Sequence, residues 1–155
     1  MATSRTLPAA RSPRPNVLIV DDDADIRDLL KAILENDYLV TEADSAAALR
    51  KAMDQKPPDV VLLDMKLPDA GGLGLLPAIK QRWPTTQVIV LTGEPADSGP
   101  GSWVAEATHA GAFGILCKSA DFSIPKVLGC VSSALKRRGL ALGQEPAPPH
   151  TRPEP

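Results

Sequence analysis

Short runs of apolar residues recur along this chain, and several of them end in a polar or charged side chain. The run Val60–Leu63 leads directly into Asp64, and the run Val17–Val20 leads into Asp21. A continuous apolar run of this length, bounded by turn-forming residues, is typical of a strand buried in a parallel sheet. Three weaker or shorter segments complete a set of five expected strands: Tyr38–Ala43, Val88–Leu91 and Gly111–Cys117.

Segments with helical periodicity separate these strands. Between Ile26 and Leu34 apolar residues recur at spacings of three and four, which predicts an amphipathic helix with one face toward the core. Pro77 is expected in the first turn of the third helix, where a missing N–H is tolerated. The expected N-cap residues are Asp23, Ser45 and Ser123. After Gly71 and Gly72 the chain is expected to enter the third helix, which runs to about Trp83, and a short fourth helix is expected from about Ser102 to Ala110.

Strand and helix alternate five times, which predicts an α/β fold with a doubly wound, five-stranded parallel sheet, or (βα)5. Eight of the 16 prolines lie outside residues 16–143. Segments of that composition bury too little apolar surface to order themselves. We therefore expect a disordered lead over residues 1–15, one folded domain over residues 16–139, and a disordered Pro-rich tail over residues 140–155.

Composition excludes several classes of function. The chain has 155 residues and a formal net charge of -2, so it lacks the basic surface expected for direct nucleic-acid binding. No apolar run approaches the length of a membrane span, and no signal peptide is visible. Cys117 and Cys130 lack the spacing of metal ligands and are expected to be reduced structural thiols. These features favour a cytoplasmic protein with no membrane contact.

Polar side chains follow four of the five expected strands. Because the carboxyl ends of parallel strands meet at one edge of the sheet, Asp21, Asp22 and Asp64 are expected to converge there. Three carboxylates repel one another unless a cation lies among them, and oxygen ligands of this kind suit Mg²⁺. Thr92 and Lys118 follow the fourth and fifth strands and are suited to hold an anion attached to one of the acids. Together these groups are the parts needed for phosphoryl transfer.

Four motifs occur in order with suitable spacing: VLIVDDD, VVLLDMKLPDAGG, VIVLTGE and GAFGILCK. This set resembles the response-regulator receiver domain, the phosphoacceptor half of two-component signalling, over roughly residues 16–138. The resemblance implies a flavodoxin-like or CheY-like fold. It also implies that Asp64 accepts a phosphoryl group from the phosphohistidine of a sensor histidine kinase or a phosphotransfer protein. The only reaction expected is the domain's own phosphorylation and dephosphorylation, so a metabolic enzyme is not expected.

The resemblance also assigns roles to the neighbours of the acceptor. Asp22 would ligate Mg²⁺ directly and Asp21 mainly through water, and the backbone carbonyl of Lys66 would complete the metal site. Thr92 matches the switch hydroxyl of the family. Lys118 matches the lysine that pairs with the phosphoryl group, whose added charge and acceptor oxygens would draw the switch residue inward.

Two positions depart from the family pattern on the output side. Ile115 stands where the family commonly has an aromatic switch residue, and Ser119 stands where a proline usually follows the lysine. The family leads us to expect a downstream protein target, and a homodimer, at the face formed by the fourth helix, fifth strand and fifth helix. A stand-alone receiver and a piece of a longer regulator are both consistent with this sequence.

Three other functions compete with this interpretation. A degenerate receiver would act as a phosphorylation-independent interaction module, which the two departures make conceivable. A haloacid-dehalogenase-like Mg²⁺-dependent phosphatase would use Asp21 as nucleophile, but residues 21–25 lack the Thr or Val that closes its DxDx(T/V) motif. A flavodoxin-like binder of flavin mononucleotide needs a Ser-, Thr- or Gly-rich loop after the first strand, and three aspartates there would repel its phosphate.

Overall fold

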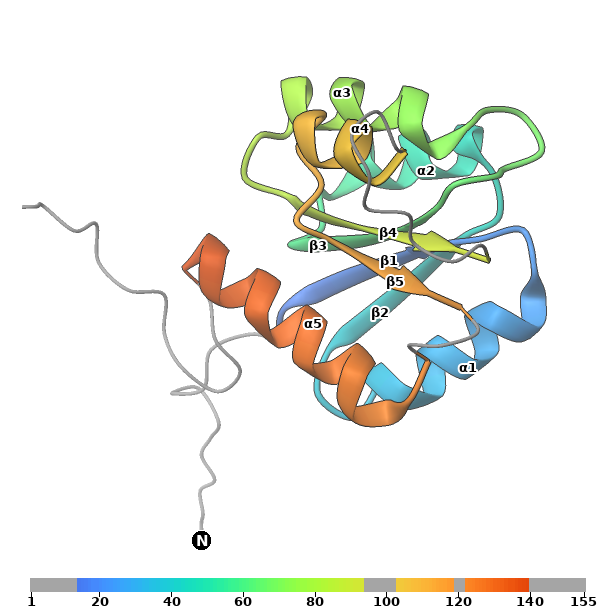
Figure 1. The fold of residues 1–155 in the computed structure, drawn as a ribbon. Coiled ribbons are helices and arrows are strands. Elements are labelled where there is room, and N and C mark those ends of the chain that lie inside the picture. Colours follow the sequence, from blue (N-terminus) through green and yellow to red (C-terminus); the bar gives the residue numbers. More distant parts are fainter. Residues whose placement is uncertain (1–13, 94–102, 119–121, 140–155) are drawn as a thin grey trace, which may run out of the picture.

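The structure, a computed structural model, describes residues 14–93, 103–118 and 122–139, in which strands and helices alternate along the chain (Figure 1). The strands are β1 (Asn16–Val20), β2 (Leu39–Ala43), β3 (Val60–Asp64), β4 (Gln87–Thr92) and β5 (Gly114–Cys117). The helices are α1 (Ala24–Leu34), α2 (Ala46–Gln55), α3 (Gly72–Arg82), α4 (Trp103–His109) and α5 (Ile124–Arg138).

All five strands are parallel and lie in the order β2-β1-β3-β4-β5. The predicted doubly wound α/β sheet is therefore confirmed. Every residue of β3 is buried, whereas β2 lies at an edge and is mostly exposed. From β1 the chain adds β2 on one side and then β3, β4 and β5 on the other, so the order of strands switches at the β1–β3 pair, where Val20 lies opposite Leu63. A crevice at this switch point, beyond the carboxyl ends of the strands, is where open α/β sheets place their ligands.

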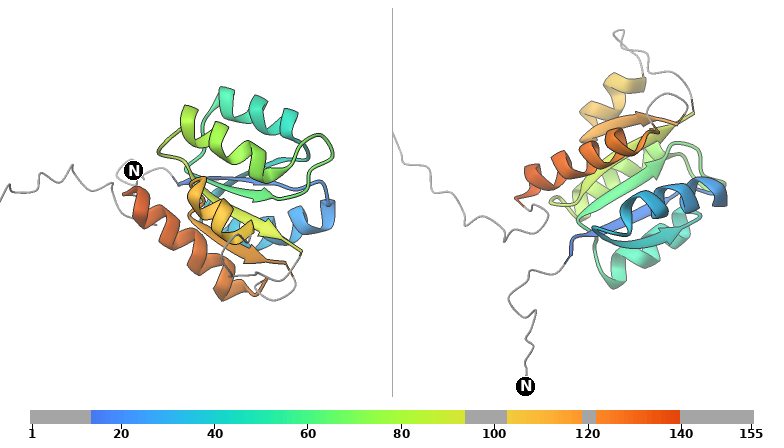
Figure 2. Two further views of the ribbon diagram at one scale, coloured as in Figure 1. Left: turned by 45° about the horizontal axis from the view of Figure 1, so that its top comes forward. Right: turned by 90° about the horizontal axis from the view of Figure 1, so that it is seen from below.

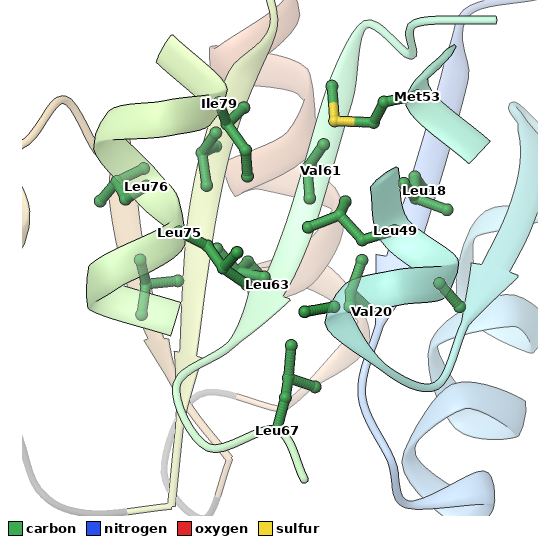
Figure 3. Close-up of a cluster of buried hydrophobic side chains, with 14 of the residues drawn as sticks. Leu18, Val20, Leu49, Met53, Val61, Leu63, Leu67, Leu75, Leu76 and Ile79 are labelled. Atoms are coloured by element: carbon green, nitrogen blue, oxygen red, sulfur yellow. The ribbon is translucent and has the colours of Figure 1, made fainter. Parts of the chain in front are cut away.

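The sheet has a hydrophobic core on each face. Helices α2, α3 and α4 cover one face, and α1 and α5 cover the other (Figures 1 and 2). Successive strand residues point to opposite faces, so Leu18 and Leu63 pack with α2 and α3, whereas Ile19 and Leu62 pack with α1 and α5. Figure 3 shows the first of these cores, in which Leu67 from the β3–α3 loop also takes part. Both faces are filled, which makes the strand ends the place for polar chemistry.

The predicted N-caps of three helices are confirmed. Asp23 begins α1 and accepts a hydrogen bond from the Asp25 N–H at 2.9 Å. Ser45 begins α2 and accepts from the Ala48 N–H at 3.1 Å. Ser123 begins α5, which ends at a left-handed glycine in the usual manner.

One local prediction was wrong. Pro77 is the sixth residue of α3 and lies inside the helix, not in its first turn. The helix begins at Gly72 because the Gly72 N–H bonds the Met65 carbonyl at 2.8 Å and closes the preceding loop immediately before it. Pro77 is exposed, so the carbonyl that its missing N–H leaves without a helical partner lies on the solvent side.

The boundaries of the last strand also differ from expectation. β5 begins at Gly114 and not at Gly111, because Gly111 adopts a positive φ of 111° and turns the chain after α4. The contact with β4 begins one residue before β5, where the Phe113 N–H donates to the Val88 carbonyl at 2.7 Å. A side chain at position 111 would also meet Lys80 Cγ at 2.9 Å, so this turn requires glycine twice over.

Some expectations fall on residues outside the described ranges. These are the segments 1–13 and 140–155, which were expected to be disordered, and Ser119 after the site lysine. Within the described ranges no helix is long and apolar enough to cross a bilayer. No disulfide joins Cys117 to Cys130.

Candidate functional site

The carboxyl ends of β1, β3, β4 and β5 bring four predicted site residues to one edge of the sheet. Asp21 directly follows β1, Asp64 and Thr92 are the last residues of β3 and β4, and Lys118 directly follows β5. The pairing of Val20 with Leu63 makes the first two of these residues neighbours across adjacent strands. The site is therefore a consequence of strand order.

Asp21 is completely buried, and each part of the residue is held by a different contact. Its Oδ1 accepts a hydrogen bond from the Asp23 N–H at 2.9 Å, and its own N–H bonds the Ala43 carbonyl of β2 at 3.1 Å. Its Oδ2 lies 2.7 Å from Lys118 Nζ as an ion pair. Among the described residues no group gives Oδ2 a hydrogen bond with favourable angles. A buried carboxylate oxygen in this condition is poised to accept a further cationic partner.

Asp64 is also buried, with 5% of its surface exposed. Its Oδ1 accepts hydrogen bonds from the Lys66 N–H and from Lys118 Nζ, both at 3.3 Å. Burial raises the pKa of the Asp64 carboxyl, and the charge of Asp21 raises it further, against the opposing effect of Lys118. Loss of hydration and a like charge both disfavour the ionised form. A second cation beside Asp64 would relieve this unfavourable state.

Lys118 contacts both buried acids with one ammonium group. Burial by itself would lower the pKa of Lys118, but contact with Asp21 and the charge of Asp64 outweigh burial and raise it. The ammonium group therefore stays charged across the neutral range. The backbone N–H of Lys118 donates to the Thr92 carbonyl at 2.7 Å, which ties the chain after β5 to the end of β4.

The three acids expected to bind a metal are within reach of one ion. One oxygen from each of Asp21, Asp22 and Asp64 lies within 4.8 Å of the other two. Two of these residues are buried, and Asp22 is exposed at the mouth of the site. Carboxylate oxygens with one side open to solvent suit Mg²⁺, which keeps several waters when it binds proteins. The donor set and the poorly satisfied Asp21 Oδ2 therefore fit this ion.

The remaining predicted residues surround this acidic pocket. Lys66 lies two residues beyond Asp64, with its side chain exposed. Thr92 is buried at the end of β4. Ile115 lies opposite Val90 in the β4–β5 pair and packs against the core that α2, α3 and α4 cover. It is thus part of the sheet and not part of the acidic pocket.

Two residues that sequence reasoning missed hold the backbone around the pocket. Arg27 of α1 donates from Nη1 to the Asp21 carbonyl at 2.7 Å and from Nε to Glu42 Oε1 at 3.1 Å. Asp69, in the β3–α3 loop, accepts hydrogen bonds from the first two N–H groups of α2. The position of Arg27, one helical turn after Asp23, could have indicated a contact with the end of β1. The contact of Asp69 could not be foreseen from the sequence, because it joins a loop to the start of a helix 22 and 23 residues earlier in the chain.

Comparison with known proteins agrees with this geometry. The family profile of the response regulator receiver domain matches residues 17–124. The response regulator protein PilR of Pseudomonas aeruginosa is 38% identical over 126 residues, which are 81% of this chain and 27% of PilR. The DNA-binding transcriptional regulator NtrC of Proteus hauseri is 38% identical over 121 residues, covering 77% of this chain and 24% of NtrC. The match thus spans about a quarter of each relative.

Solved structures lead to the same family. The beryllofluoride-activated NtrC4 receiver domain, a dimer in solution, superposes with a TM-score of 0.70 at 31% sequence identity. The match covers 79% of this chain and 98% of that domain. The family match extends over most of the chain and includes Asp21, Asp64 and Lys118 at the ends of their strands. The chain therefore belongs to the response regulator receiver domain family.

Proposed function

We propose that this domain accepts a phosphoryl group on Asp64 from the phosphohistidine of a sensor histidine kinase or a phosphotransfer protein. One observation carries the proposal. Two buried carboxylates, those of Asp21 and Asp64, form ion pairs with the same ammonium group, that of Lys118. The pKa of the Asp64 carboxyl is raised. Keeping charges in this arrangement costs free energy in the fold. A site that binds cations and transfers an anionic group explains why the arrangement exists.

The metal site of the proposal is built on three carboxylates, each with one oxygen within 4.8 Å of the other two. Asp21, Asp22, Asp64 and the backbone carbonyl of Lys66 would hold Mg²⁺. When bound, the ion supplies charge neutralisation between the attacking carboxylate and the incoming phosphoryl oxygens. Lys118 would neutralise a further phosphoryl oxygen, since its ammonium lies 3.3 Å from Asp64 Oδ1 and stays charged.

The transfer step is a substitution at phosphorus. An oxygen of Asp64 forms the new O–P bond while the P–N bond of the phosphohistidine breaks. The electron pair of that bond stays on the imidazole nitrogen, which takes up a proton. The chain's own residues position the carboxylate: the Lys66 N–H and Lys118 Nζ both bond Oδ1, which keeps the side chain in one orientation.

The output of the proposal is a change on the face formed by α4, β5 and α5. The acyl phosphate would attract the buried Thr92 hydroxyl, and the shift would pass along β4 to Ile115 on β5. A hollow between β5 and α5 is lined by Phe113, Ile115 and Cys130 among others, and offers apolar contact to a downstream protein. The NtrC4 receiver, a related domain, is a dimer. We propose a protein target or a second copy of this chain as the partner.

We propose residues 16–139 as the receiver unit, with the segments 1–15 and 140–155 outside it, acting in the cytoplasm. The relatives PilR and NtrC are much longer than the part of them that matches this unit. The only chemistry assigned to the unit itself is gain and loss of its own phosphoryl group.

The test is intact mass after incubation with Mg²⁺ and acetyl phosphate, a small phosphodonor. Wild-type protein is expected to gain one phosphoryl group, and Asp64→Asn or a chelator is expected to prevent the gain. Asp44→Asn is the matched control, because it removes an exposed aspartate that follows β2. A folded wild type that gains no phosphoryl group from acetyl phosphate or from a phosphohistidine donor would overturn the proposal. It would favour a phosphorylation-independent interaction module.

A further inference from the structure

The loop between β3 and α3 folds back on itself directly beside the acidic pocket. The Leu67 N–H bonds the Ala70 carbonyl at 3.1 Å, and Lys66 pairs with Gly71 in an isolated antiparallel bridge. Gly72 then packs closely against the start of the loop, because a Cβ at this position would lie 2.5 Å from the Asp64 carbonyl oxygen. The ends of the loop are therefore held against the acceptor residue itself.

The tip of the loop is held by a separate contact. The Asp69 carboxylate accepts a hydrogen bond from the Ala46 N–H at 2.8 Å through Oδ1 and from the Ala47 N–H at 3.1 Å through Oδ2. These are the first two N–H groups of α2, which have no acceptor within the helix. Ser45 already caps the Ala48 N–H, so the loop and the helix's own cap divide these donors between them.

The contact is electrostatically favourable. The hydrogen bond from the Ala46 N–H, with smaller contributions from the Ala47 N–H and from Arg50, lowers the pKa of the Asp69 carboxyl. Asp69 is therefore ionised at neutral pH. A carboxylate at the N-terminus of a helix also interacts favourably with the helix dipole. Asp69 thus forms a charged link, although its side chain lies at the surface.

The link closes a ring around the pocket. On one side, the Asp21 N–H bonds the Ala43 carbonyl at the end of β2, and the chain continues from there into α2. On the other side, the chain runs from Asp64 through Lys66 to Asp69. The two hydrogen bonds of Asp69 join these two sides. Lys66 therefore lies on a short segment that is held at Asp64, two residues before it, and at Asp69, three residues after it.

We propose that Asp69 is a positioning residue for the cation site: its bonds to α2 keep the Lys66 peptide in place beside the three carboxylates. This inference rests on the proposed metal-dependent function. Asp69 itself does not contact the ion in this proposal. Groups that orient metal ligands from behind typically change metal affinity by ten- to a hundredfold when they are removed.

The test is a calorimetric titration of metal-free protein with Mg²⁺. Asp69→Ala is expected to weaken binding by about tenfold. Asp69→Asn keeps one acceptor oxygen for the α2 N–H groups and is expected to lie between Asp69→Ala and the wild type. Asp44→Asn is the control, because it removes the same charge two residues before Ala46 whereas Ser45 and Asp69 provide the caps of α2. It is expected to change the affinity much less than Asp69→Ala.

Two further readouts separate positioning from simple helix capping. The rate of phosphorylation by acetyl phosphate is measured over a range of Mg²⁺ concentrations. The half-saturating concentration is expected to rise with Asp69→Ala, while the rate at saturating Mg²⁺ stays within about twofold of the wild type, since the carboxylates are intact. Amide exchange at Lys66 and Leu67 is expected to accelerate in the same variant.

The outcomes distinguish this inference from the function on which it rests. If Asp69→Ala lowers the stability of α2 but leaves the Mg²⁺ affinity and the exchange at Lys66 unchanged, Asp69 is a helix cap only and the inference is wrong. If the wild type binds no Mg²⁺ and gains no phosphoryl group, the proposed function fails first and the inference fails with it.

Discussion

The two ends of the parallel sheet differ in how the charges of their aspartates are compensated. At the carboxyl end, Asp21 and Asp64 both contact the Lys118 ammonium, and no group among the described residues gives Asp21 Oδ2 a hydrogen bond with favourable angles. At the amino end, Asp59 precedes β3 and uses both of its oxygens. Oδ2 accepts from the Asn16 N–H at 2.8 Å, and Oδ1 pairs with Arg138 Nε at 3.2 Å.

Other polar groups at the amino end are satisfied in the same way. The buried Thr86 hydroxyl donates to the Pro58 carbonyl at 2.8 Å. Lys80 Nζ donates to the carbonyls of Pro84 and Thr86 at 3.0 and 2.7 Å. One strand, β3, thus connects an aspartate that stabilises the fold to an aspartate that strains it. The comparison teaches that burial beside a like charge, and not residue type, separates a structural acid from a candidate reactive one.

The first way to test this contrast is to remove the amino-end acid. Asp59→Ala leaves the Asn16 N–H and the partly buried Arg138 without their partner, so it is expected to lower the free energy of unfolding by about 2 kcal/mol. Asp59→Asn keeps an acceptor for Asn16 and is expected to lose less. Urea unfolding at neutral pH measures both. Equal stability of Asp59→Ala and the wild type would show that this network contributes nothing to the fold.

The second test removes the carboxyl-end acid from metal-free protein. Because burial and Asp21 raise the pKa of Asp64, its ionised form destabilises the folded state. Asp64→Asn, which stays neutral, is therefore expected to raise the free energy of unfolding at pH 7, by up to about 1 kcal/mol. The sign is opposite to that at Asp59.

The pH dependence of this second effect follows from linkage. The folded protein holds the Asp64 proton more tightly than the unfolded chain, so the stability contributed by this one group is fully present below the ordinary carboxyl pKa of 3.8 and is lost as pH rises through the folded value. The gap between Asp64→Asn and the wild type is expected to grow from acid to neutral pH in chelator. Excess Mg²⁺ is expected to stabilise the wild type more than the variant. A variant that is less stable than the wild type at every pH would contradict the idea of a strained pocket.

The general plan of this fold could be predicted because its signals are local. Buried parallel strands such as Val60–Leu63 are apolar on both faces, and Asp23, Ser45 and Ser123 cap helices through donors only two or three residues away. The meeting of the strand ends is a consequence of topology, so the proximity of acids that follow different strands could also be foreseen.

What could not be predicted depends on contacts between distant segments. Asp69 bonds N–H groups 22 and 23 residues earlier in the chain, and nothing in its own neighbourhood indicates α2 as its partner. The start of α3 depends on how closely Gly72 packs against the backbone of Asp64, which moved Pro77 to the sixth position of the helix. The positive φ of Gly111 likewise shortened β5. In each case the deciding interaction is tertiary.

The smallest expected effect concerns an exposed ion pair between α2 and α3. Arg82 Nη2 lies 3.0 Å from Asp54 Oδ1, but the two side chains are 66% and 50% exposed. Solvent screens such a pair, and ordering two long side chains costs entropy, so Asp54→Ala is expected to change the free energy of unfolding by less than about 0.5 kcal/mol. Arg82 also lies over the Trp83 ring at 4.8 Å, a contact that Asp54→Ala leaves in place.

A double-mutant cycle with Arg82→Ala isolates the ion pair from that ring contact. The coupling between Asp54 and Arg82, measured by urea unfolding, is expected to fall further when salt is added. A coupling above about 1 kcal/mol, beyond the usual range for exposed pairs, would show that exposed charges stabilise this fold as strongly as partly buried ones. The contrast between Asp59 and Asp64 would then have to rest on the number of partners alone, since burial would no longer distinguish a weak pair from a strong one.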